Sequence, residues 1–124
     1  MEDVHNFNNM FIELVSQLST ICPTSIIANN SNILKQIIKK DQRKVIDIFV
    51  HYVLKYKQQI DKGDESFFIN NSYSGECGSD EGMVNKVFEF KELWKQLSPD
   101  NRNIVIQYMQ FLCQIALNYI DSRR

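Results

Sequence analysis

Apolar residues recur at spacings of three and four along most of the chain, and this pattern predicts an all-α protein. The pattern covers residues 7–21, 32–40, 42–60, a shorter stretch that ends near Leu97, and 99–120. We expect a compact bundle of four to five helices in a single domain that spans residues 1–124. A chain of this length buries enough surface for a self-sufficient core.

The most apolar segment, residues 45–56, has only three polar positions, Asp47, His51 and Lys55. Their spacing of four residues places them in one narrow stripe on a helix, and every other direction is apolar. Such a helix needs neighbours on nearly all sides. We therefore expect residues 42–60 to form the central helix of the bundle.

Helix starts are marked by capping residues. Ser98 is an N-cap candidate, Pro99 suits the first helical position, and Asp100 places a negative charge in the first turn. A long helix is therefore predicted to begin at this point. Ser31 and Asp41 are further N-cap candidates, for the second and the central helix.

Residues 61–82 break the helical pattern and contain all four glycines of the chain, together with six acidic residues and one lysine. They predict a long acidic loop rich in Gly, Ser and Asn. Within it, the apolar triplet at 67–69 is expected to dock onto the bundle as a short turn or an extended anchor. Residues 24–30 are expected to be a connector, and the alternation at 88–90 leaves a brief strand open there.

Composition narrows the classes of function only slightly. The net charge of −1 gives no overall attraction to nucleic acid or to an anionic membrane. Cys22, Cys77 and Cys113 lie far apart, which argues against a disulfide framework and favours a reducing compartment. No apolar run is long enough to span a bilayer, so we expect a soluble, cytoplasmic protein with no role in membranes.

No catalytic residue, metal site or cofactor site is predicted. Asp47 and His51 are spaced like an acid–histidine pair, but no nucleophile stands at a defined distance, and exposed helix residues often show this pattern. Cysteines and histidines do not form the closely spaced ligand pairs of structural zinc sites. We therefore expect no enzyme activity.

The last helix carries a stripe of uncharged amides at spacings of three and four. Its members are Asn103, Gln107, Gln110, Gln114 and Asn118. One interpretation is that these are ordinary solvated positions. The other is a protein interface, because amides pair across a contact without the desolvation cost of charges. Apolar arcs that include Ile106, Met109 and Leu117 also exceed what a small bundle easily covers, which favours a homo-oligomer or another protein partner.

A local excess of basic residues occurs between residues 35 and 57, with seven bases against two acids. The candidates for contact with phosphate groups are Lys35, Lys39, Lys40, Arg43 and Lys44. Such a cluster attracts nucleic acid backbones without sequence-specific contacts. The alternative is a solvated face that offsets the acidic loop.

The C-terminal half combines an aromatic-x-x-apolar-Trp segment, a Ser-led turn and a helix that contains Tyr-apolar-Gln-x-Leu. The residues are those of 90–98 and Asn101, Ile104, Tyr108, Met109, Gln110 and Leu112. With 56–60 and 64–68, this combination resembles small helical proteins of unknown function from nucleocytoplasmic large DNA viruses. The resemblance covers roughly residues 56–120 and rests on packing residues. It implies a viral protein of the infected cell, with the virion as a second location.

These features predict a non-enzymatic viral structural, assembly or protein-interaction protein. A protein that associates with nucleic acid through the basic segment 35–57 is the alternative. Enzymatic function ranks third, because no residue constellation supports it.

Overall fold

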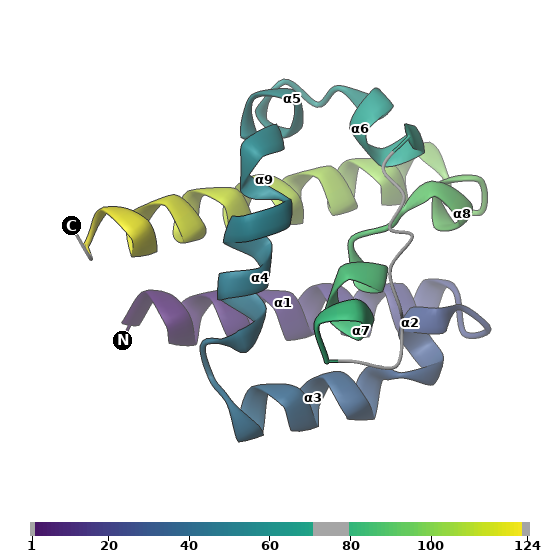
Figure 1. Cartoon of the computed structure of the whole chain (residues 1–124). Coiled ribbons are helices and arrows are strands. Elements are labelled where there is room, and N and C mark those ends of the chain that lie inside the picture. Colours follow the sequence, from purple (N-terminus) through teal and green to yellow (C-terminus); the bar gives the residue numbers. More distant parts are fainter. Residues whose placement is uncertain (1, 71–79, 123–124) are drawn as a thin grey trace.

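The two longest helices, α1 (Glu2–Ile21) and α9 (Pro99–Asp121), pack side by side and run in opposite directions (Figure 1). The computed structural model describes residues 2–70 and 80–122. A third helix, α4 (Lys44–Tyr52), crosses this pair in Figure 1 and contacts both of its members. Every regular element in the described residues is helical, which confirms the all-α prediction.

Aromatic side chains connect these helices at the centre of the core. Phe7 and Phe11 of α1, Phe49 of α4 and Phe88 are each at most 1% exposed. The ring of Phe49 lies edge-on to Phe7 at 5.1 Å between centroids and to Phe88 at 5.2 Å. Burial of such side chains is the main favourable term in folding. The part of the predicted central helix that forms α4 therefore does lie at the core.

The prediction of one continuous helix at 42–60 is wrong, because the chain changes direction after Tyr52. α4 ends there, and the 3-10 turn η1 (Leu54–Tyr56) leads into α5 (Lys57–Asp61). A straight helix with apolar residues on nearly all sides would leave one side uncovered. The bend lets α4 pack against α1 while Ile60, fully buried, packs where α5 meets α9.

Two helices follow α1 in the chain, α2 (Ile26–Asn29) and α3 (Ser31–Lys40). The segment 24–30, expected to be only a connector, thus contains a helical turn. α3 matches the predicted 32–40 to within one residue. The first helix begins earlier than predicted, and Glu2 and Asp3 add favourable negative charge to its first turn.

Of the three predicted N-cap residues, only Ser98 occupies the N-cap position of a helix. Ser98 is the N-cap of α9, and its Oγ accepts a hydrogen bond from the backbone N–H of Asn101 at 3.2 Å. Ser31 is the first helical residue of α3, and Asn30 occupies the N-cap position without a side-chain capping bond. Asp41 Oδ1 accepts from the backbone N–H two residues later, at 3.1 Å, and so stabilises the turn before α4.

The predicted loop at 61–82 contains helical structure at both ends. α6 (Glu65–Asn70) lies within it, and α7 (Asp80–Val87) begins inside its last residues. The prediction of a continuous loop is therefore wrong for these parts. The intervening residues 71–79 lie outside the described residues.

Two apolar residues of α6 dock onto the core, as the triplet at 67–69 predicts. Phe67 and Phe68 are 3% and 0% exposed, whereas Ile69 points outward and is 47% exposed. Gly63 precedes them with φ of 68°, a left-handed conformation that favours glycine. This residue ends α5 and turns the chain toward α6.

The helix expected before Leu97 is divided into α7 and a single turn, α8 (Lys91–Trp94). Phe88 and Phe90 lie between the two pieces and are almost fully buried. No strand forms at 88–90. Both aromatic residues pack into the core from a non-helical segment, which explains why their alternation resembled a strand.

Candidate functional site

One face of α9 carries exposed apolar side chains surrounded by uncharged polar ones. Phe111 is 58% exposed and Ile104 is 37% exposed, close to the middle and the start of the helix. We refer to this face as the α9 strip, and its members are Asn103, Ile104, Gln107, Phe111, Gln114 and Asn118. Four of the five amides predicted for an interface therefore lie together on one exposed face.

The fifth amide, Gln110, has a role inside the fold. Its Nε2 donates to the backbone carbonyl oxygens of Ile60 at 3.1 Å and Asp61 at 3.2 Å. These carbonyls lie at the end of α5, beyond the reach of the regular intrahelical bonds, and that of Ile60 also accepts from the backbone N–H of Gly63 at 3.0 Å. Gln110 therefore ties α5 to α9.

The exposed apolar surface of α9 differs from the one expected at Ile106, Met109 and Leu117. Met109 is fully buried, and Ile106 packs against the core with partial exposure. The most exposed apolar side chain on α9 is instead that of Phe111. Its spacing of four from Gln107 and three from Gln114 already puts it on the amide stripe. Sequence reasoning missed this signal because a phenylalanine in an amphipathic helix is normally assigned to the core.

A shallow hollow adjoins the α9 strip where α9 meets α1. It measures about 220 Å³, and its lining residues are Met10, Glu13, Ile104, Gln107, Tyr108 and Phe111. A second hollow of about 430 Å³ lies next to it along α1 and shares Glu13 and Tyr108. The first hollow has a mixed apolar and polar lining that includes the exposed ring of Phe111, which is the type of surface that side chains of a protein partner fill.

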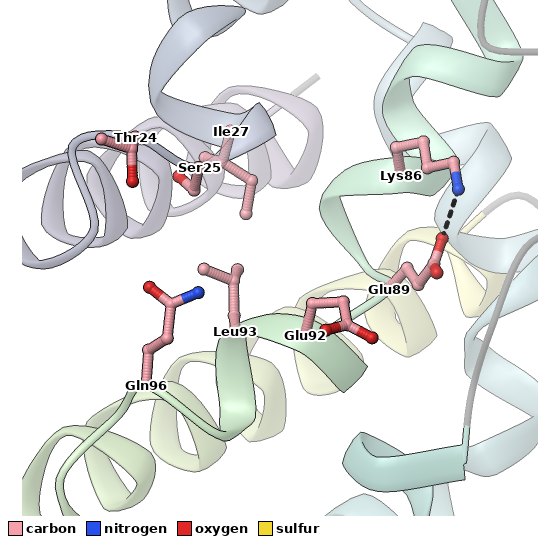
Figure 2. Close-up of a pocket in the computed structure, with 8 residues that line it drawn as sticks. All are labelled: Thr24, Ser25, Ile27, Lys86, Glu89, Glu92, Leu93 and Gln96. Carbon is pink, nitrogen blue, oxygen red and sulfur yellow. Dashed lines mark hydrogen bonds and ion pairs between the residues drawn. The ribbon is translucent and has the colours of Figure 1, made fainter.

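A separate hollow of about 220 Å³ lies between α2, α7 and α8 (Figure 2). Ile27 and Leu93 point into it, while Lys86 and Glu89 form an ion pair of 2.8 Å at one side. Ser25 Oγ accepts from a backbone N–H at 3.1 Å and caps α2. The remaining lining residues are Thr24, Glu92 and Gln96. An apolar floor and an already paired carboxylate do not arrange a nucleophile with a base.

The stripe of Asp47, His51 and Lys55 does not form one site. Asp47 accepts a hydrogen bond from the Tyr119 hydroxyl at 2.8 Å, so this carboxylate joins α4 to α9. His51 is exposed, and its ring lies edge-on to Tyr52 at 4.5 Å. Lys55 belongs to η1, beyond the end of α4. The structure therefore gives Asp47 a packing role.

The basic segment is divided by the fold into two parts. Lys55 and Lys57 lie at the far end of α4, and Lys57 pairs with Asp61. The other five bases lie between the middle of α3 and the start of α4, and we refer to them as the basic corner. Its members are Lys35, Lys39, Lys40, Arg43 and Lys44. All are exposed except the partly buried Lys44.

Cys22 and Cys113 are buried, and burial raises the pKa of both thiols. Cys77 lies outside the described residues. Among residues 2–70 and 80–122, no three His, Cys, Asp or Glu side chains come close enough together to hold a metal ion. None of the helices in these ranges has the length and apolar character to cross a membrane.

Comparison with protein-family models, with curated proteins and with solved structures gives no match for this chain. The α9 strip with its adjoining hollow is the site that combines exposed apolar area with hydrogen-bonding groups. We therefore consider it the candidate functional site.

Proposed function

We propose that this protein is a non-enzymatic interaction protein that self-associates through the α9 strip. The observation that carries the proposal is the 58% exposure of Phe111 in the middle of a long helix with no charged residue from Asn103 to Ile120. Burial of the part of this side chain that is still exposed gains about 1–2 kcal/mol, because complete burial of an aromatic side chain gains about 1.5–3 kcal/mol. The amides around it pair without the desolvation cost of charges.

An assembly role is also supported by the resemblance of residues 56–120 to small helical proteins of large DNA viruses. We include in the proposal that this protein contributes to viral assembly, in the infected cell or in the virion. The packing residues that carry the resemblance include Trp94, which stacks on Phe68 of α6, and Leu93, which lines the hollow between α2, α7 and α8. Both are buried.

The experiment is light scattering on a sizing column at two protein concentrations, with wild type and Phe111→Gln. We expect wild type to reach at least twice the mass of one chain and the variant to remain at the mass of one chain. Both copies gain free energy of association from the burial of Phe111. The substitution removes both contributions, so it should weaken association at least about tenfold. Glutamine is a good helix former, so α9 should remain intact.

Ile69→Gln is the matched control, because Ile69 is also apolar and 47% exposed but belongs to α6. This variant should retain the wild-type mass. A wild type with the mass of one chain at both concentrations contradicts the proposal, as does equal weakening by both variants.

Association with nucleic acid is a second candidate function, favoured by the basic corner. Lys39 and Lys40 end α3, and Arg43 immediately precedes α4, so short separations bring several cations together. Phosphate groups bind such clusters through charge alone. The net charge of −1 ranks this candidate below self-association.

A further inference from the structure

We infer that the α9 strip pairs with the α9 strip of a second copy of this chain, with the two helices antiparallel and Phe111 of each copy inserted into the hollow of the other. This inference rests on the proposed function and specifies its geometry. Three features support this inference. They are the residues that line the hollow, the pairing of residues between two copies that the hollow allows, and the absence of charged residues on most of this surface.

The hollow beside the α9 strip has the composition of a knobs-into-holes site. Its four α9 residues, Ile104, Gln107, Tyr108 and Phe111, stand at i, i+3, i+4 and i+7. Four residues at this spacing form the hole that receives a side chain from a facing helix. Met10 and Glu13 of α1 close one side of it. Phe111 is thus both a wall of the hollow and an exposed side chain able to fill a second one.

Two-fold symmetry then determines which residues of the two α9 helices face each other. If Phe111 of one copy enters the hollow between Gln107 and Tyr108 of the other, the reverse contact forms at the same time. Ile104 then lies opposite Ile115 of the second copy, which pairs two apolar residues. A parallel arrangement would put each residue opposite its own copy and leave both hollows unfilled. Antiparallel helices also oppose their dipoles favourably.

The charge distribution favours a second copy as the occupant. The chain from Asn103 to Ile120 has no charged residue, and Glu13 is the one charged residue that lines the hollow. An acidic partner would lose hydration against this surface without a counter-charge, and a basic partner would find only Glu13. A second copy presents the same amides, and each amide both donates and accepts hydrogen bonds.

The experiment is cysteine cross-linking in a Cys77→Ser background, where the remaining Cys22 and Cys113 are buried. In the inferred register, Asn103 lies within about two residues of Gln114 of the second copy along the helix axis. Both positions are exposed, so substitution should preserve the fold, and circular dichroism checks this. We expect the double variant Asn103→Cys/Gln114→Cys to form covalent dimers with a short thiol cross-linker, at least tenfold more than either single variant.

A bond within one chain cannot mimic this result. Positions 103 and 114 lie about 16 Å apart along one helix, since each residue adds about 1.5 Å. Efficient cross-linking of Asn103→Cys alone indicates a parallel pair and overturns the inference. Absence of cross-links in every variant, with light scattering still showing a dimer that depends on Phe111, also overturns it but leaves the proposed function intact. A single-chain mass for wild type overturns both.

Discussion

At the scale of single residues, burial changes the chemistry of Cys113. This thiol is fully buried on α9, and its loss of hydration raises its pKa to about 12. The negative charge of Asp61 also raises the pKa, and Lys57 lowers it slightly. A thiol in this environment stays protonated under all ordinary conditions, so it behaves as a small apolar side chain.

The raised pKa of Cys113 predicts a loss of stability at alkaline pH. The unfolded thiol ionises near pH 9, whereas the folded one stays neutral until about pH 12. The free energy of unfolding should therefore be unaffected below pH 9 and fall as the pH rises above it. At pH 10 the loss is about 1.4 kcal/mol.

Urea denaturation of wild type and Cys113→Ala at pH 8 and pH 10 measures this loss. The substitution removes the titrating group and leaves a small void whose cost does not depend on pH. The difference in unfolding free energy between the two proteins should therefore shrink by about 1.4 kcal/mol between the two pH values. An unchanged difference would show that Cys113 does not titrate as described.

At the scale of helices, one aromatic cluster holds α6, α8 and α9 together. Phe68 of α6 stacks on Trp94 of α8 with 4.4 Å between ring centroids and 10° between planes. Trp94 Nε1 donates to Glu65 at 3.1 Å, and Arg102 of α9 donates to the Trp94 carbonyl oxygen at 2.7 and 3.0 Å. Neither short helix would be stable alone, so these contacts stabilise both.

Phe68→Ala should therefore destabilise the protein by about 3–5 kcal/mol, through lost burial and the cavity left behind. Ile69→Ala is the matched control on the same helix, and its effect should be small because Ile69 is 47% exposed. Trp94 is the only tryptophan, so its fluorescence during urea denaturation reports on this cluster directly. Equal effects of the two substitutions would mean that α6 does not dock on Trp94.

Helix assignment from sequence succeeded where local rules decide the outcome. α9 begins at Pro99 because a serine cap and a proline specify a helix start without help from distant residues. The same rules failed after Tyr52, where apolar residues on all sides predicted an unbroken helix. Whether such a segment bends depends on the helices that cover it, and no local pattern contains that information.

At the scale of the whole molecule, basic residues gather at one place although the total charge is near zero. The basic corner lies at the start of α4, whereas Lys57, beyond the other end of α4, is paired with Asp61. If the second candidate function is correct, a short DNA duplex should be retarded by the protein at low salt. About five phosphate contacts would reduce the affinity several hundredfold between about 50 and 200 mM salt.

Lys39→Glu/Lys40→Glu should abolish this retardation. Lys91→Glu/Lys95→Glu is the matched control, because it changes the net charge equally at exposed positions near α8, away from the basic corner. The control should retain most of the binding. Absence of retardation at low salt, or equal loss in both variants, would reject the nucleic acid function.

The candidate site was predictable in part. The amide spacing located four members of the α9 strip, because a stripe follows directly from 3.6 residues per turn. The sequence could not separate Gln110 from these four, since its partners at Ile60 and Asp61 are about 50 positions away in the chain. The sequence does place Phe111 on the same stripe, but the exposed fraction of its side chain depends on how far α1 covers α9.

The sequence by itself determined the helical class of this protein, the course of α1, α3 and α9, and the residue at which α9 begins. Spacing of apolar residues and helix capping are local properties, so a single chain segment is sufficient to specify them. Only the tertiary structure decided the bend between α4 and α5, the orientation of Ile69 away from the core that Phe67 and Phe68 enter, and the degree to which Phe111 is exposed. Each of these depends on which distant side chains compete for the same buried volume.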